Sequence, residues 1–485
     1  MAKLNKSEMF RSIDENKETI TGVSDKIWDY AETAFEEFRS AELIEGVMRD
    51  HGFDVESGTG GIETAFCATF GSGAPTIGIL AEYDALSGLS QEAGSAARRE
   101  AVPGGNGHGC GHNLFAGASI GAAIAVKEYM ESNNPCGTVK LFGCPGEEGG
   151  SGKAFMARAG VFGRLDAAFA WHPMSVNAIL DMSLLANYQV LYKFKGTASH
   201  AAAAPEKGRS ALDAVELMNV GVNFLREHVI QEARIHYAIT NAGGFSPNVV
   251  QPYAEVLYLM RAPRTPQVEE IYRRVNKIAR GAALMTETDL EIQFVKACAN
   301  VVPNKTLSRV LHENLTAQEM PSYTEEERAF AAEIAKTVPG SVSSDIGRYL
   351  GSHPADMKRC LESLEGKPLC DIALPFYLDD PEHIMAGSSD VGDVSWIAPT
   401  AQVVTACCVL GTPEHSWQMV SQGRTSIGHK GMILASKTMA GGVVDTLESP
   451  EIIKSAKAEL ANRLGGEVYR SAIPADVMPR AISKL

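Results

Sequence analysis

The stretch GHGCGHNLFAGASIGAAIAVKEYMES, residues 107–132, decides the fold, because a polar glycine-rich turn leads directly into a long apolar helix. The helix pattern runs from Asn113 to Ser132, and its small and apolar side chains predict a buried helix. Apolar runs typical of buried strands lie on either side, in PTIGILAEYD (Pro75–Asp84) and GTVKLFGCPGEE (Gly137–Glu148). The order strand, helix, strand predicts a largely parallel sheet covered on both faces.

A different pattern occupies the middle of the chain. From about Asn187 the runs NYQVLYKFKGTA and AEVLYLMRAP alternate apolar and polar residues, which is typical of an antiparallel sheet with one face in water. Amphipathic helix patterns cover Ser210–Glu227 and Gln267–Leu284. Together these runs predict a β-α-β-β-α-β module of about a hundred residues.

The first pattern returns after Val302. It ends with a predicted strand, QVVTACCVLG (Gln402–Gly411), and a helix that follows Gly428. The segment Thr316–Pro381 is charged and irregular, and its sequence assigns it to neither pattern.

The length of 485 residues is enough for two or three domains. We expect an α/β domain with a mostly parallel sheet, built from residues 1–187 and 300–485. A smaller α+β domain of ferredoxin-like topology, residues 188–299, is expected to interrupt it.

Composition restricts the function classes. The net charge of −15 argues against a nucleic-acid partner, which would require clustered Lys and Arg. No apolar run is long enough to span a membrane, and the N-terminal residues lack the apolar core of a signal peptide. The nine cysteines have no framework spacing, and several lie in apolar runs, which indicates reduced core thiols. We therefore expect a cytoplasmic protein.

Residues able to bind a metal follow several of the predicted strands. They are Glu82 and Asp84 after the first strand, Glu147 and Glu148 after the second, His172 at the third, His415 after the last, and Cys110 and His112 before the long helix. Because ligands bind outside the carboxyl ends of the strands in an open α/β sheet, we expect these side chains to converge. Mixed N, O and S donors are typical of a transition-metal site.

Each of these features also has a simpler interpretation. Cys110 and His112 fit an ordinary helix-entry turn, and the pair Glu147–Glu148 fits solvated loop acids. A lone histidine in the apolar context of His172 is more often a hydrogen-bonded core residue, and His415 could be a loop histidine. The joint placement of these residues, and no single one of them, predicts the metal site.

Two other features compete with this interpretation. His429, in a Gly-His-Lys-Gly run, competes with His415 for the last ligand position, and we prefer His415 because it follows a predicted strand. The run Gly146–Lys153 resembles a phosphate loop, but it has one intervening residue too many, and Ala154 replaces the hydroxyl residue that would hold magnesium.

The residue set suits hydrolysis of an amide. A divalent metal polarises the carbonyl and lowers the pKa of a bound water, and a carboxylate beside that water can transfer its proton to the leaving nitrogen. Two successive glutamates, Glu147 and Glu148, supply a base and a ligand. Asp84 is expected to orient a ligand from behind.

The sequence motifs resemble those of a known group, subgroup D of the M20 family of metallopeptidases and amidohydrolases. The motifs that carry the resemblance are GHGCGHNL (Gly107–Leu114), CPGEEGGSGK (Cys144–Lys153), AWHP (Ala170–Pro173), GTASHAAAAPEKGRSALDA (Gly196–Ala214), SSDVGDVSW (Ser388–Trp396) and GTPEHSW (Gly411–Trp417). The resemblance extends from about residue 20 to 445 and is faint only over Thr316–Pro381.

The resemblance implies a role for each site residue. Two divalent ions, Mn²⁺ or Zn²⁺, would be bound by Cys110, His112, Glu148, His172 and His415, with Glu147 as the general base. The α+β domain would be a lid and dimerisation domain, from which His200 reaches a neighbouring active site to stabilise the oxyanion. Asn248 and Arg261 match lid positions that grip substrate oxygens.

The resemblance also implies a substrate and partners. We expect hydrolysis of an N-acyl-glutamate amide, with p-aminobenzoyl-glutamate as the substrate, by a homodimer or a heteromer with a related A-type subunit. The alternatives are a dipeptidase or another N-acyl-amino-acid hydrolase, and a catalytically silent binding subunit. The silent subunit is least favoured, because the ligand and base positions are all intact.

Overall fold

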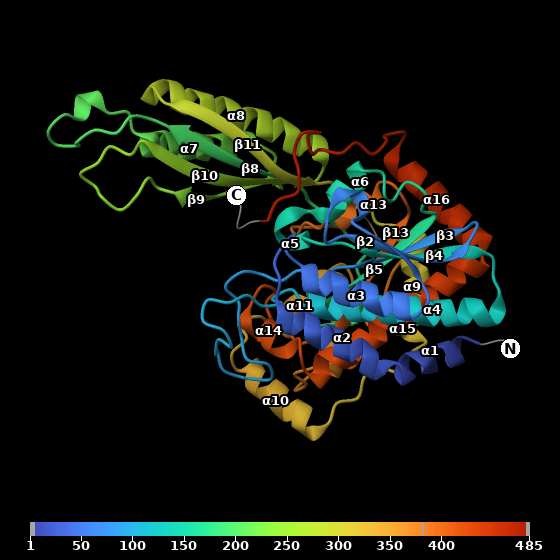
Figure 1. Ribbon diagram of the computed structural model, residues 1–485. Coiled ribbons are helices and arrows are strands. Elements are labelled where there is room, and N and C mark those ends of the chain that lie inside the picture. Colours follow the sequence, from blue (N-terminus) through green and yellow to red (C-terminus); the bar gives the residue numbers. More distant parts are fainter. Residues whose placement is uncertain (1–4, 381–382, 482–485) are drawn as a thin grey trace.

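The computed structural model describes residues 5–380 and 383–481, so the first four residues and Pro381 lie outside it. Figure 1 shows a larger part with a central sheet and a smaller part that projects from it. The strands of the large sheet, in spatial order, are β1 (Asp54–Ser57), β2 (Phe66–Ser72), β4 (Gly137–Gly143), β3 (Thr76–Ala81), β5 (Ala167–Met174), β13 (Thr400–Ala406) and β6 (Ala178–Ile179).

The centre of this sheet is parallel. Strands β4, β3, β5 and β13 run in one direction, so their carboxyl ends meet at one edge. Strands β2 and β6 are antiparallel to them, and β1 pairs antiparallel with β2. Long helices α4 and α15 pack on one face, and α6 and α13 lie on the other (Figure 1). The helices of this part are α1 (Lys6–Glu15), α2 (Lys17–Tyr30), α3 (Phe38–Asp50), α4 (His112–Asn133), α5 (Glu147–Gly150), α6 (Gly152–Arg158), α9 (Lys305–Thr316), α13 (Val391–Ser395), α14 (Trp417–Gln422), α15 (Ser426–Glu448) and α16 (Pro450–Leu464).

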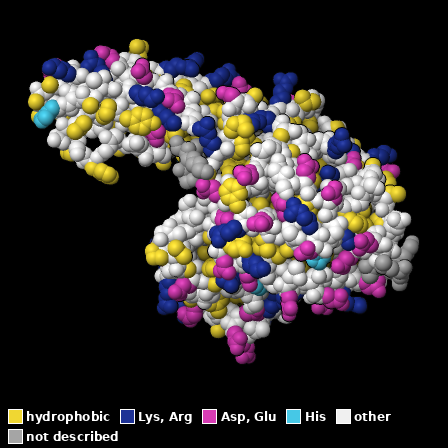
Figure 2. Space-filling view, viewed as in Figure 1, with side chains coloured by type: hydrophobic (Ala, Val, Ile, Leu, Met, Phe, Trp, Pro, Cys, Tyr) yellow, Lys and Arg dark blue, Asp and Glu magenta, His cyan; other side chains and the backbone are white. Residues whose placement is uncertain are grey.

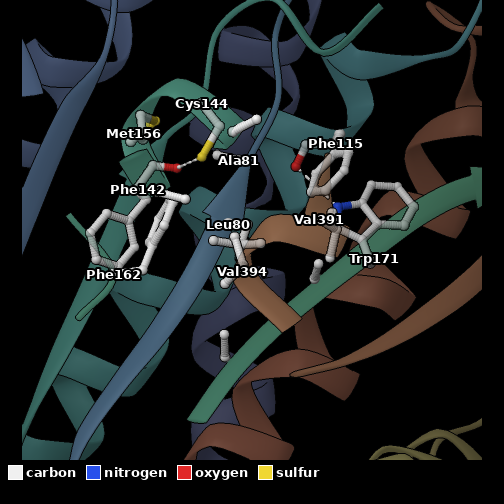
Figure 3. Close-up of a cluster of buried hydrophobic side chains, with 14 of the residues drawn as sticks. Leu80, Ala81, Phe115, Phe142, Cys144, Met156, Phe162, Trp171, Val391 and Val394 are labelled. Atoms are coloured by element: carbon white, nitrogen blue, oxygen red, sulfur yellow. Dashed lines mark hydrogen bonds between the residues drawn. The ribbon is translucent and has the colours of Figure 1, made fainter. Parts of the chain in front are cut away.

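The core fixes the turn before α4 against the end of β5. Trp171 is fully buried, and its indole Nε1 donates a hydrogen bond of 3.0 Å to the carbonyl of Phe115 in the first turns of α4 (Figure 3). On the other side of the sheet Leu80 packs with Val391 and Val394 of α13 (Figure 3). Since side chains in such a core interdigitate closely, the start of α4 cannot shift relative to β5 without a packing cost.

The projecting part has the predicted β-α-β-β-α-β order. Its elements are β8 (Ala186–Lys195), α7 (Ala211–Leu225), β9 (Arg234–Asn241), β10 (Tyr253–Ala262), α8 (Thr265–Thr286) and β11 (Asp289–Cys298). The sheet order β11-β8-β10-β9, with every neighbouring pair antiparallel, is the ferredoxin-like arrangement. The predicted fold class is therefore confirmed, while the domain boundaries at residues 188 and 299 stay a prediction.

The segment that the sequence left unassigned is helical. It contains α10 (Glu325–Ala335), α11 (Val342–Leu350) and α12 (Pro354–Ser363). Thr324 and Ser341 accept a backbone N–H at the first two helix starts, and proline begins the third. The remaining short elements are β7 (Ser183–Leu184), β12 (Ile384–Met385), η1 (Thr59–Gly61), η2 (Pro205–Lys207) and η3 (Arg226–His228).

One predicted strand is wrong at its end. The expected run Gln402–Gly411 pairs only as far as Ala406: the N–H of Cys407 makes the last hydrogen bond to β5, at the carbonyl of Met174, and the chain then turns. Gly411 has a φ of 81°, a conformation that glycine adopts without strain. His415 therefore lies nine residues beyond β13 and does not directly follow it.

Two expectations about composition can be compared with the structure. All nine cysteines are free thiols, and eight of them are buried, in agreement with the prediction of reduced core thiols. Among the described residues, no helix has the length and apolarity needed to cross a membrane.

A buried carboxyl ties the two parts and the C-terminal segment together. Asp393 in α13 is 2% exposed and accepts hydrogen bonds from the N–H of Ala299 (3.0 Å) and the hydroxyl of Tyr469 (2.7 Å). Burial raises the pKa of Asp393 from its ordinary value of 3.8 to about 7. Between these two pH values the folded chain holds a proton that the unfolded chain releases, so stability falls as pH rises toward 7.

This carboxyl makes stability depend on pH in a way that Asp393→Asn removes. We expect the variant to match the wild type near pH 4 and to be more stable at pH 8, by up to about 4 kcal/mol. Urea unfolding of both proteins at pH 4, 6 and 8 measures this. Parallel pH dependences for the two proteins would show that Asp393 titrates normally.

Candidate metal centre

The candidate residues converge at the carboxyl edge of the parallel strands. The turn before α4 supplies Cys110 and His112, the start of α5 supplies Glu147 and Glu148, and β5 supplies His172. A cavity of about 270 Å³ is lined by all of these except His112, which lies buried behind it, and also by His415 and Arg261.

Donor atoms in this region form two overlapping groups. Within each group every donor lies within 4.8 Å of the others, and the groups are Cys110, His112 and His172, and Cys110, Glu148 and His415. Cys110 belongs to both, as a thiolate shared between two ions would. Together they contain all five residues that the sequence proposes as ligands. A third group joins Glu82 and Glu147 to His112.

Several donor atoms lack the hydrogen bonds that burial normally requires. The Nε2 atom of His112 and the Oε1 atom of Glu148 are buried without a hydrogen-bond partner, although Glu82 and His415 lie within 3.2 Å and 3.0 Å of them. The Sγ atom of Cys110 lies 3.4 Å from Nε2 of His172. Unsatisfied N and O atoms beside a thiol and a second imidazole fit a transition-metal centre.

Neighbouring groups orient these donors. Asp84 Oδ1 lies 2.8 Å from Nδ1 of His112, and Asp84 Oδ2 accepts the backbone N–H of Glu148 at 2.9 Å. Nδ1 of His172 lies 3.1 Å from the carbonyl of Pro173. The imidazoles of His112 and His172 are therefore held through Nδ1, with Nε2 directed toward the donor group. Asp84 lies behind His112, in a position to orient it as the sequence predicts.

The site concentrates negative charge away from water. Burial and the neighbouring carboxylates Glu82 and Asp390 raise the pKa of Glu147 well above its usual range. Burial lowers the pKa of His112, but Asp84 and Glu82 outweigh it and raise the pKa to about 10. A divalent cation bound here would offset this concentration of buried negative charge.

The lid residues named from the sequence do not all reach this cavity. Arg261 lines it, and its Nη1 donates to the hydroxyl of Ser388 at 3.2 Å. His200 and Asn248 lie together in the loops that follow β8 and β9, where His200 forms a β-bridge with Val249. These loops lie at the outer end of the projecting part (Figure 1). His429, the competing ligand, is paired with Asp25 at 2.8 Å and does not line the cavity.

Comparison with known proteins identifies the family. The model of peptidase family M20/M25/M40 matches residues 78–356, more than half of the chain. The chain belongs to this peptidase family. The resemblance drawn from the sequence motifs is thereby confirmed.

The chain is similar to two M20-type proteins of known name and to one solved M20 structure. The chain is 47% identical to the B-type subunit of the p-aminobenzoyl-glutamate hydrolase of Escherichia coli (strain K12), over 97% of this chain and 99% of that protein. It is 34% identical to the Xaa-Arg dipeptidase of Mus musculus, over 62% of this chain and 69% of that protein. The Bacillus subtilis YXEP protein, a dinuclear metal-binding M20 peptidase, superposes with a TM-score of 0.54 at 16% identity, over 90% of this chain and 99% of that chain.

Behind the donors of this M20 chain lies a lysine that sequence reasoning missed. Lys153 is fully buried, and its Nζ lies 2.6 Å from both Glu82 Oε1 and Asp390 Oδ1. Its backbone N–H also donates to Asp390 Oδ2 at 2.8 Å. The only sequence feature that pointed to Lys153 was its position at the end of the run Gly146–Lys153, which resembles a phosphate loop. Nothing in the sequence links Lys153 to Asp390. The ammonium balances two carboxylates that border the candidate metal ligands.

Replacing Lys153 by Met should strongly destabilise the protein. It leaves two buried carboxylates without their cation, and breaking such a pair costs roughly 3–5 kcal/mol. Urea unfolding measures this loss. Lys454→Met, which removes an exposed lysine beside Glu451 on α16, is the matched control, with an expected change below about 0.5 kcal/mol. A loss below about 1 kcal/mol for Lys153→Met would contradict the network's role.

The helical segment over residues 325–363 adds a wall to the cavity. Tyr349 of α11 lines it, and its hydroxyl is buried without a hydrogen-bond partner. Residues after the segment, from Met385 to Asp390, continue the same wall. The part of the sequence that was hardest to interpret thus contributes to the site.

Proposed function

We propose that this M20 chain hydrolyses p-aminobenzoyl-glutamate to p-aminobenzoate and glutamate. The observation that carries the proposal is one cavity lined by Cys110, which both donor groups share, by the acid Glu147 and by the cation Arg261. The extent and identity of the match to the Escherichia coli hydrolase support this substrate over other amides.

Two divalent ions, Mn²⁺ or Zn²⁺, are proposed to occupy the two donor groups. Bound there, they would polarise the scissile carbonyl and make a water molecule easier to deprotonate. The thiol of Cys110 favours zinc, whereas the carboxylate and imidazole donors also accept manganese. The dinuclear metal binding of the Bacillus subtilis relative supports a pair of ions.

Glu147 is proposed to move the proton. Its carboxyl lies at the start of α5, lines the cavity and belongs to a donor group with Glu82 and His112. There it can take a proton from water and deliver it to the leaving nitrogen, which must be protonated before the C–N bond breaks. Arg261, held by Ser388, would bind a substrate carboxylate and orient the amide.

A dipeptidase is the second candidate, because the mouse Xaa-Arg dipeptidase is 34% identical. Its substrates, by its name, end in arginine. The acids of the cavity lie at the candidate metal centre, whereas Arg261 and Lys296 lie on the lid strands, where they would attract a carboxylate of the leaving group; this favours glutamate. The silent-subunit alternative is least favoured because Glu147 and every proposed ligand are present.

A panel of amides separates these candidates. The metal-loaded protein is incubated with p-aminobenzoyl-glutamate, N-acetyl-glutamate, an Xaa-Arg dipeptide and an indole-acetyl amino acid, and products are resolved by liquid chromatography. We expect p-aminobenzoyl-glutamate to give the highest kcat/KM. Preference for the arginine dipeptide would replace the proposal by the second candidate.

The assembly is proposed to be a homodimer formed through the projecting lid. Strand β9 is one edge of its sheet, and its side chains Tyr237 and Ile239 are exposed, as is Phe224 near the end of α7. Figure 2 shows hydrophobic side chains on the surface of the projecting part. Pairing two such edges would bring His200 and Asn248 of one chain toward the cavity of the other. A heteromer with an A-type subunit is the alternative, and the expected location is the cytoplasm.

A further inference from the structure

Lys296 is a lysine whose side chain is mostly buried and has no counter-ion among the described residues. It lies near the end of β11, is 7% exposed and lines the same cavity as the candidate metal ligands. Its side chain makes no hydrogen bond or ion pair with any residue that the structure describes. Its ammonium is not among the buried atoms that lack a partner, so it is open to the cavity, where it can bind an anion that arrives from outside.

A β-bulge directs Lys296 into the cavity. Up to Phe294 the even-numbered residues of β11 pair with even-numbered residues of β8, such as Val190. Their side chains lie on the face of the sheet that the helices cover. The register shifts between Phe294 and Lys296, so that Lys296 lies opposite Gln189 on the other face. Without the extra residue, alternation would direct this lysine toward α7 and α8.

The cavity face of the lid sheet therefore has two rows of side chains. The inner row is Arg261, Asn187 and Cys298, and the outer row is Leu259, Gln189 and Lys296. All six line the cavity. The Nε atom of Arg261 is also buried without a partner. Two cations that form no ion pair with a described residue thus lie on one face, two strands and one row apart, which is roughly 10 Å across the strands.

We propose that Lys296 binds the γ-carboxylate of the glutamate leaving group, while Arg261 binds the α-carboxylate. This rests on the proposed function and narrows it to a dicarboxylate leaving group. The inner row is the one linked to the candidate metal centre, because Arg261 contacts Ser388, which lies two residues before Asp390. Asp390 pairs with Lys153, which also pairs with Glu82. The α-carboxylate is nearest the scissile nitrogen and belongs to this row, and the γ-carboxylate extends to the outer row.

The test varies the protein and the substrate together. Hydrolysis of p-aminobenzoyl-glutamate is compared with that of p-aminobenzoyl-glutamine and of the α-amide analogue, in wild type, Lys296→Met and Lys296→Arg. We expect Lys296→Met to lower kcat/KM for the glutamate substrate on the order of 10–100-fold, mostly through KM, and to change the glutamine substrate less than about threefold. Lys296→Arg should restore part of the loss. Lys193→Met, on the same face of the same sheet but outside the cavity, is the control.

A binding measurement makes the outcome independent of turnover. Calorimetric titration of free glutamate and glutamine into metal-loaded wild type and Lys296→Met reports selectivity directly. Loss of the glutamate preference in the variant supports the proposal, even if the wild type releases no p-aminobenzoate and the proposed function itself fails. A variant that keeps the glutamate preference, or loses discrimination against the α-amide instead, would overturn it.

Discussion

Glu147→Gln is expected to lower kcat for p-aminobenzoyl-glutamate by roughly 10²–10⁴-fold, because glutamine can neither accept nor deliver the proton. KM and the metal content should stay close to those of the wild type, since Glu147 is proposed as the base and Glu148 as the ligand. Steady-state kinetics and elemental analysis of the same preparation measure all three quantities.

A neighbouring acid provides the matched control for this prediction. Glu414 also lines the cavity but belongs to neither donor group, so Glu414→Gln should change kcat less than about threefold. Suppose instead that Glu147→Gln bound less metal and kept the wild-type activity per bound ion. Glu147 would then be a ligand, and another group would be the base.

The second large effect concerns the lid of the partner. His200→Ala should lower kcat/KM roughly 10²–10³-fold if His200 stabilises an oxyanion. His200 does not line the cavity of its own chain, so the proposal requires that it act in the partner's site. Mixing inactive His200→Ala and Glu147→Gln chains after subunit exchange should then restore activity to about a quarter of wild type, because half of the dimers are mixed and each has one complete site.

The mixing experiment has clear opposite results. Recovery of activity supports the homodimer and the action of His200 across it. An inactive mixture of proteins that have exchanged subunits contradicts both. His228→Ala, an exposed histidine on the same part of the molecule, should leave activity within about twofold of wild type.

The regular parts of the fold were predictable because their periodicity is simple. The alternation along β8 and β10 and the apolar faces of α7 and α8 gave the ferredoxin-like order, with helix ends correct to about two residues. The apolar run at 402–411 predicted too long a strand, since its last residues are buried in a turn instead of a ladder. The helices between 325 and 363 are short and begin at caps, so no long period marks them.

The candidate ligands were predictable for a topological reason. Parallel strands place their carboxyl ends at one edge, so residues that follow different strands can be grouped without coordinates. Lys153 and Lys296 could not be found in this way. Lys153 depends on a contact with Asp390, far away in sequence, and Lys296 faces the cavity only because of a bulge that strand alternation does not predict.

The most direct test of the central claim is metal content measured together with p-aminobenzoyl-glutamate hydrolysis, before and after chelation and reloading. We expect about two divalent ions per chain and release of p-aminobenzoate. Chelation should remove both the ions and the hydrolytic activity, and reloading with zinc or manganese should restore both. A folded protein that binds no metal after reloading, or that hydrolyses the substrate equally well without metal, would contradict the central claim.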